Sequence, residues 1–305
     1  MKRVYSTNNF YVVLAILYVI LTLLLPSSHA TRQTYHLSSL QYHVLLLLVI
    51  LPVLLIWFAA FYGYAKLQEY AHLIQDTTEG PDYQRIASGV KWLAWGIPIP
   101  SFVSLVLNAI TDSHPGFRSP SIIVSIYLNL LIPLVAFTLI STGTRGLLDK
   151  ARIRLRANEI KLTILAFVVI GVGFCYLIFQ HLDLRYANSA RNPYYLPLWL
   201  VITTITIPYL YTWMIGLLSC YEMHLIAKQT KGVLYQKAIR RLSVGLVSII
   251  GTSIALQYLR SLMPRSGYLA LGVALIMTYL VLVLAAIGYA LIAYGAKKLK
   301  KIEEV

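Results

Sequence analysis

The sequence carries little charge. Only 12% of its 305 residues are Asp, Glu, Lys or Arg, whereas soluble domains carry about 25%. Apolar residues make up 58%, and several apolar runs exceed the roughly 20 residues that a helix needs to cross a bilayer. These runs show no period-2 alternation, so they predict α-helices. The composition therefore predicts an integral membrane protein, with no room for a soluble catalytic domain.

Patterns that carry enzyme chemistry are also lacking. The sequence has no G-x-S-x-G, H-E-x-x-H, Walker, Rossmann or C-x-x-C motif. Its two cysteines, Cys175 and Cys220, lie in apolar runs, which is typical of small buried residues rather than of a disulfide. The last apolar run has no lysine before Lys297, which excludes a retinal Schiff base on that helix. We therefore expect no enzyme activity, no cofactor and no metal in this chain.

Basic residues are abundant, with a net charge of +15, but their distribution indicates topology. The apolar runs predict eight membrane spans at 9–26, 41–64, 88–111, 120–144, 160–181, 195–217, 240–263 and 269–296. With the N-terminus in the cytoplasm, only six of the 26 basic residues fall outside: Arg32, Arg118, Arg185, Arg191, Arg260 and Arg265. This positive-inside bias predicts a multi-pass protein of the cell membrane with both termini cytoplasmic. The surplus favours contact with anionic lipids over nucleic acid.

An alternative concerns the first span. Lys2 and Arg3 precede an apolar run that ends near Ser28-His29-Ala30, a pattern that resembles a signal peptide. Cleavage after Ala30 would leave seven spans with the N-terminus outside.

The second half of the chain repeats the first at an offset of 152 residues. His72-Leu73-Ile74 recurs as His224-Leu225-Ile226, and the same offset relates Gly80 to Gly232. We interpret this as internal duplication rather than as coincident membrane spacing. Four spans per repeat put both halves in the membrane in the same direction, which predicts an all-α bundle of two parallel four-helix repeats. The expected parts are a first repeat at 1–152, a second at 153–296 and a cytoplasmic helical tail at 297–305.

No charged residue lies near the middle of a predicted span, which argues against an ion-coupled transporter. Polar residues there could form a site between the halves, although such residues more often bond neighbouring helices. The candidates for an intramembrane polar site are Tyr127, Asn129, Thr203, Thr204 and Tyr279.

The cytoplasmic ends of the second and sixth spans carry repeated polar residues. Glu69-x-x-His72 has a spacing found in metal-binding bundles, but the second repeat breaks it, so a helix-end network is the preferred reading. We expect a conformational joint here, formed by Glu69, His72, Gly80, Tyr83, Glu222, His224, Gly232 and Tyr235.

Histidines gather on the predicted outer side. Imidazole titrates near neutral pH and binds transition metals, so an outer cluster is a candidate sensor of pH or metal, although ordinary surface histidines are the simpler reading. The candidate sensing residues are His29, His36, His43, His114 and His181.

The C-terminal segment gives the strongest functional indication. Ile292, Gly295, Leu299 and Ile302 follow a 3-4-3 spacing that continues a helical seam out of the membrane, with Leu299 and Ile302 in the expected output helix. Residues 296–305 resemble the linker before the dimerisation helix of bacterial sensor histidine kinases. The resemblance implies a sensor region, forming a homodimer, that acts on a cytoplasmic kinase domain or partner.

The leading hypothesis is therefore a membrane sensory module that passes a signal through its last helix. The alternative is a small-solute transporter, facilitator or channel with a pathway on the pseudo-two-fold axis. A third class is a scaffold for assembly or lipid binding.

Overall fold

The computed structural model describes residues 39–113, 118–151, 207–230, 232–262 and 268–304, with isolated helical positions at 12–20, 165 and 168. Every regular element in these ranges is an α-helix, which confirms the all-α prediction. Three of the helices contain stretches long and apolar enough to cross a membrane: Ile50–Leu73, Leu128–Lys150 and Tyr279–Glu303. The predicted spans 9–26 and 160–181, and the first part of 195–217, lie outside the described residues.

The described residues form seven helices. They are α3 (Ser39–Leu73), α4 (Gly80–Trp95), α5 (Pro98–Ser113), α6 (Arg118–Lys150), α9 (Ile207–Gln229), α10 (Val233–Leu262) and α11 (Tyr268–Glu303).

The helices continue well past the predicted span ends. α3 was expected to stop at 64 but ends at Leu73, and α10 begins at Val233 rather than at 240. The expected boundaries followed the first polar residues, yet Leu67, Ala71 and Ile74 are buried beyond them. Their spacing of three to four keeps one helical face apolar, so the bundle extends beyond the uniformly apolar part of each run.

The expected single span 88–111 is broken in two. α4 ends at Trp95, and the Gly96 amide donates to the Trp92 carbonyl over 2.8 Å. Pro98 follows, has no amide hydrogen to donate and restricts the residue before it, so the chain restarts as α5. Pro52 and Pro133, by contrast, lie inside continuous helices α3 and α6.

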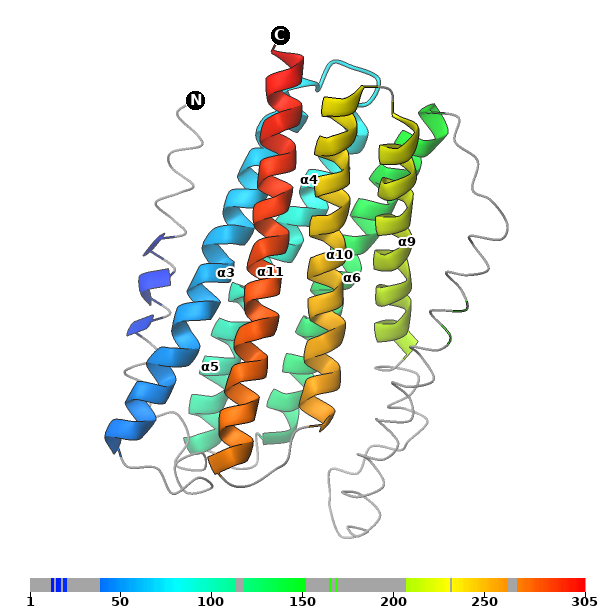
Figure 1. Ribbon diagram of the computed structural model, residues 1–305. Helices are drawn as coiled ribbons and strands as arrows, with labels where there is room; N and C mark the ends of the chain where they lie inside the picture. Colours follow the sequence, from blue (N-terminus) through cyan, green and yellow to red (C-terminus); the bar gives the residue numbers. More distant parts are fainter. Residues whose placement is uncertain are drawn as a thin grey trace.

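Six helices form a closed ring of neighbours (Figure 1). Around the ring the order is α3, α4, α6, α9, α10, α11, and α11 packs again on α3. α5 packs mainly on α6. Figure 1 shows α3, α11, α10 and α9 on the near side with α4, α5 and α6 behind them. The interior is filled by large side chains, among them Trp57, Phe137, Met223 and Ile239, which are almost completely buried.

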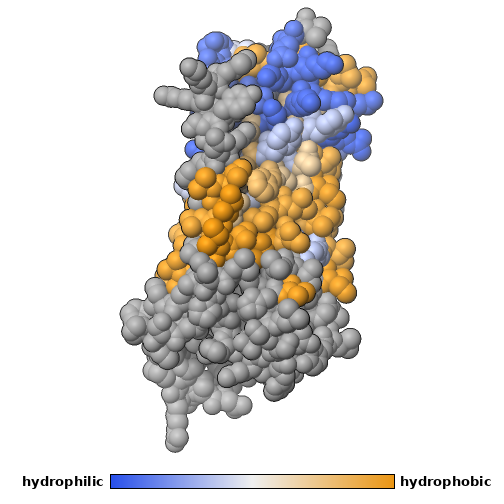
Figure 2. Space-filling model, turned by 90° about the vertical axis from the view of Figure 1, so that its left-hand side faces the viewer, coloured by the Kyte–Doolittle hydropathy of each residue, from blue (hydrophilic) through white to orange (hydrophobic). Residues whose placement is uncertain are grey.

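One end of the bundle is polar and the adjoining region is apolar. Figure 2 shows a hydrophilic cap above a hydrophobic band. The cap lies where α3, α6, α9 and α11 end and where α4 and α10 begin (Figure 1). Exposed apolar side chains of α3 and α11 include Leu51, Leu55 and Leu280. A large exposed apolar surface of this kind suits lipid chains.

Candidate functional site at the polar end of the bundle

Two tight connections place the polar-end residues. Residues 74–79 join α3 to α4, and a side chain at Gly80 would collide with the carbonyl oxygen of Ile74. The second connection, between α9 and α10, contains Gly232 with φ +106°. Glycine adopts this backbone conformation without the steric cost that other residues meet. Both connections therefore require glycine, as the repeated Gly80 and Gly232 suggested.

Three tyrosines meet in the centre of this end. The hydroxyls of Tyr83 in α4 and Tyr235 in α10 lie 3.2 Å apart. Tyr70 in α3 also bonds the Tyr235 hydroxyl, and its ring meets that of Tyr83 edge to face at 5.0 Å. Burial raises the pKa of the Tyr83 hydroxyl well above its ordinary value and also raises that of Tyr235. The cluster therefore joins three helices through neutral hydroxyls.

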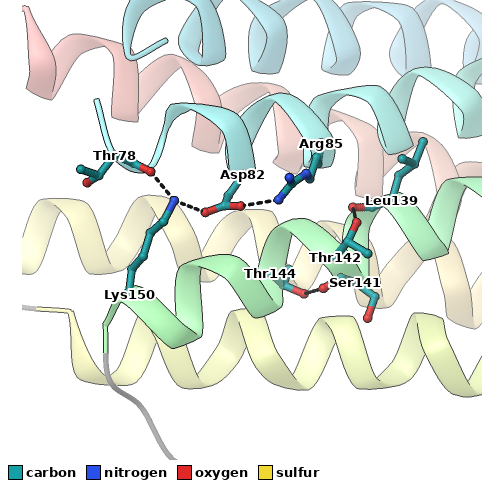
Figure 3. Close-up of polar contacts among 8 residues, drawn as sticks. All are labelled: Thr78, Asp82, Arg85, Leu139, Ser141, Thr142, Thr144 and Lys150. Atoms are coloured by element: carbon teal, nitrogen blue, oxygen red, sulfur yellow. Dashed lines mark hydrogen bonds and ion pairs between the residues drawn. The ribbon is translucent and has the colours of Figure 1, made fainter. Parts of the chain in front are cut away.

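Asp82 joins α4 to α6 (Figure 3). Its side chain is 3% exposed and lies 2.5 Å from Lys150 Nζ and 3.0 Å from Arg85 Nη1. Lys150 also donates to the Thr78 carbonyl, so one ammonium bonds both α4 and the preceding connection. Any side chain at Gly146 would overlap the Asp82 carboxylate, so glycine at this position leaves the space that the carboxylate occupies. A buried carboxylate requires such partners, because desolvation is costly for a charge without them.

Glu222 joins α9 to α6. Its carboxyl group accepts from the Thr144 hydroxyl and lies 3.2 Å from Arg145 Nε. The side chain is 1% exposed, whereas Arg145 is 59% exposed and mostly hydrated. Burial raises the pKa of Glu222 above its ordinary value, although Thr144 and Arg145 oppose the shift.

The single hydroxyl proton of Thr144 has two acceptors. The Ser141 carbonyl lies 3.0 Å from Thr144 Oγ1, and the Glu222 carboxyl group is the second acceptor. When Glu222 carries a proton, it can donate to Thr144, which then donates to Ser141. Neutral Glu222 thus satisfies both contacts, whereas ionised Glu222 competes with Ser141 for one proton.

Glu69 joins α3 to α11. Its carboxylate lies 2.7 Å from Lys66 Nζ on its own helix and 3.2 Å from Lys300 Nζ near the end of α11. Its partners thus lie in α3 itself and in α11. His72 does not join it: its ring is exposed and lies 3.3 Å from Gln68 Nε2. Among the described residues no group of three His, Cys, Asp or Glu side chains is placed to hold a metal ion.

The other expected sites stand apart from this cluster. His224 is exposed, and Asn129 and Tyr279 are half-buried. In the output helix, Leu299 is fully buried and Ile302 half-buried, so this part of the seam packs within the chain. The candidates whose side chains lie outside the described residues are His29, His36, His43, His114, His181, Tyr127, Thr203 and Thr204.

Sequence reasoning missed the partners of the buried carboxylates. Asp82, Thr144, Arg145 and Lys150 were not singled out, although all lie in helices beside the joint. One usable signal was Gly143-x-x-Gly146, because small residues at this spacing let two helices approach closely. Gly143 does face the Asp82 carbonyl, with room for no side chain.

Comparison with known proteins gives no match to a family model, to a curated protein or to a solved structure. The functional argument therefore depends on the geometry of the chain itself.

Proposed function

We propose that the chain is a membrane sensory module of two related halves, in which α11 transmits relative movement of the halves to a cytoplasmic output. The observation that carries this proposal is the placement of α11. It is one helix from Tyr268 to Glu303, it packs on α10 and on α3, and Lys300 bonds Glu69 of α3 near its end. A displacement of α3 against α10 would therefore move the end of α11.

The order of helices in the ring supports duplication. Moving three places around the ring takes α3 to α9, α4 to α10 and α6 to α11, and in each case the sequence offset of about 152 is that of the repeat. Tyr83 of α4 and Tyr235 of α10 bond each other, so the two proposed halves are in direct polar contact at this end.

Glycine contacts refine the alignment of the halves. Gly143 faces Asp82 in α4, while its counterpart Gly295 faces Ala238 in α10. Asp82 and Ala238 are 156 positions apart, four more than the offset between the glycines. Gly89 and Gly245, which also differ by 156, face equivalent residues of α6 and α11. The helices thus favour an alignment with an insertion of about one helical turn in α10, rather than the ungapped repeat.

The proposed orientation places the polar cap in the cytoplasm. Lys150, Lys228 and Lys300 lie in the last turns of helices that end there. A cytoplasmic excess of basic residues is the usual arrangement in membrane proteins.

The same geometry gives less support to the facilitator alternative. A solute path between the halves would require polar lining, whereas Phe137, Ile140 and Met223 fill the described interior. At the polar end the Tyr83–Tyr235 contact joins the halves across this region.

The test uses a fusion of the full chain, after Val305, to the cytoplasmic region of a sensor histidine kinase. One to seven alanines are inserted after Lys301, and autophosphorylation is measured in membranes. Because each residue turns a helix by about 100°, we expect activity to rise and fall with insertion length. Asp82→Asn, which weakens a contact between α4 and α6 that does not include α11, should move the maximum to another length. Leu234→Asn is the control, since Leu234 is 62% exposed near the start of α10.

A profile that Asp82→Asn leaves unchanged would contradict transmission through α11.

A second experiment measures solute uptake into proteoliposomes that contain the protein. Specific uptake from a panel of sugars, amino acids and ions, above the level of empty liposomes, would favour the facilitator.

A further inference from the structure

A polar pocket opens between α3 and α4, on the outside of the bundle. Its volume is about 220 Å³. The lining residues are Tyr64, Gln68, Ala71, His72, Gln84, Ala87, Ser88 and Lys91. The two alanines are buried, while the polar residues alternate along both helices at spacings of three to four, so that each helix turns one polar row toward the pocket.

The lining favours an anion. Lys91 supplies a fixed positive charge, His72 supplies ring nitrogens, and none of the eight lining residues is acidic. The nearest carboxylates are engaged elsewhere: Glu69 bonds Lys66 and Lys300, and Asp82 bonds Arg85 and Lys150. An ammonium with several neutral donors is a suitable set for phosphate oxygens.

Neutral groups outnumber the charge in this pocket. Gln68 and Gln84 present amides, and Tyr64 and Ser88 present hydroxyls. Amides and hydroxyls donate and accept, which suits the hydroxyl groups of a polyol. One fixed cation matches the single negative charge of a phosphodiester.

The pocket lies at the depth where lipid headgroups would be. Tyr64, Gln68 and His72 occupy the last part of the apolar stretch Ile50–Leu73. Two aromatic residues nearby face outward, Tyr62 at 52% and Trp92 at 43% exposure. Exposed Tyr and Trp side chains are characteristic of the boundary between membrane and water.

We propose that this pocket binds the phosphate ester of a polyol, as presented by the headgroup of a glycerol-type anionic phospholipid. This site does not depend on the signalling role of α11. The same chemistry is present in a free polyol phosphate, so the two sources must be separated by experiment.

The experiment measures lipid binding to the purified full chain in detergent by native mass spectrometry. Short-chain phosphatidylglycerol is compared with phosphatidylcholine of the same chain length. Wild type should prefer phosphatidylglycerol by about tenfold, because its glycerol hydroxyls can bond the amides of the pocket, whereas Lys91 repels the choline ammonium on the same phosphodiester. Lys91→Gln should remove the preference, and Gln84→Leu should reduce it. Lys237→Gln, which removes an exposed lysine from the polar end of α10, should retain it.

Two results would overturn the site: no headgroup preference in wild type, or equal losses in Lys91→Gln and Lys237→Gln. Thermal unfolding of each variant separates loss of binding from loss of folding, and Gln84→Leu provides the test if Lys91→Gln unfolds. Competition by free glycerophosphoglycerol, a soluble phosphodiester, would support recognition of the soluble ester. A preference for phosphatidylglycerol that glycerophosphoglycerol leaves intact would support the lipid.

Discussion

The pairs α4–α6 and α10–α11 both approach closely at glycines, but a buried carboxylate also crosses the interface of α4 with α6. Asp82 bonds Lys150 in the first pair. In the second pair, a side chain added at Gly245 would lie 2.6 Å from the Gly288 carbonyl oxygen, and one at Gly288 would lie 2.8 Å from that of Gly245. Under the proposed duplication, these are equivalent helix pairs with different chemistry. The Asp82–Lys150 contact depends on charge, whereas the Gly245–Gly288 contact depends on shape.

Their arginines differ in the same way. Arg85 of α4 pairs with Asp82 on its own helix. Arg241 of α10, its counterpart at an offset of 156, lies over the ring of Tyr294 in α11 at 4.3 Å. Tyr294 corresponds to Thr142 of α6, which offers no ring. The second pair has thus exchanged an ion pair for a cation–π contact, which keeps its helices together without a buried acid.

The largest effect is expected where the backbones touch. Gly288→Ala places a methyl group against the Gly245 carbonyl and Ile249, and should lower the free energy of unfolding by about 3 kcal/mol. Gly251→Ala is the matched control, because nothing lies within 4 Å of its added carbon. The control should be neutral or stabilising by up to about 1 kcal/mol. Unfolding in mixed micelles measures both, and equal effects would contradict the close packing of α10 on α11.

A somewhat smaller effect is expected from the buried carboxylate. Asp82→Asn keeps the shape but removes the charge facing Lys150 and Arg85. Because Lys150 is partly exposed and can regain water, we expect a loss of about 2 kcal/mol. Leu234→Asn should cost almost nothing in the same unfolding assay. Equal losses in the two variants would contradict the role given to the buried carboxylate.

Glu222 should make the free energy of unfolding depend on pH. Its pKa is raised in the folded protein, so between its ordinary value near 4.5 and the raised value the folded state retains a proton that the unfolded state loses. Its contribution to stability is therefore complete below pH 4.5 and decreases as pH rises through the folded pKa. Glu222→Gln, whose amide can donate to Thr144 permanently, should flatten this part of the curve. The test compares the unfolding free energies of wild type and Glu222→Gln between pH 4 and 8. An unchanged slope of free energy against pH in Glu222→Gln would contradict the role given to the Glu222 proton.

The smallest effect is expected at the tyrosine pair. Tyr83→Phe and Tyr235→Phe each remove the 3.2 Å contact and should cost about 1 kcal/mol. The double variant should lose less than the sum of the two, because both single changes break the same bond. Additive losses in this cycle would show that the hydroxyls act separately.

The sequence predicted the membrane helices and much of the polar end, but not how the polar end is bonded. Helices were predictable because apolar runs of this length leave few other structures in a bilayer. The repeated Gly80 and Gly232 marked two real connections, and the repeated Tyr83 and Tyr235 proved to be in contact. Asp82 and Glu222 act through Lys150 and Thr144 on another helix. Such pairs depend on helix rotation and register, which periodicity does not define to the required residue.

Under the proposed duplication, the one-turn difference between the halves could not be predicted from the sequence, for a related reason. The 152-residue offset aligns the connections and α6 with α11, while the packing of α4 and α10 on those helices follows 156. A helix shifted by one turn presents nearly the same face, so hydrophobic periodicity hardly changes. The close contacts of Gly89 and Gly245, and those of Gly143 and Gly295, distinguish the two alignments.

The most direct test of transmission through α11 is a double-mutant cycle on Glu69 and Lys300 in the kinase fusion. Glu69→Gln, Lys300→Gln and the double variant are compared by autophosphorylation in membranes at the insertion length of highest activity. Because the two side chains meet at 3.2 Å between α3 and α11, we expect each single change to shift activity and the double variant to match the singles. Equal activity in all four proteins, or shifts that simply add, would contradict the claim that α11 carries movement of the halves through this contact.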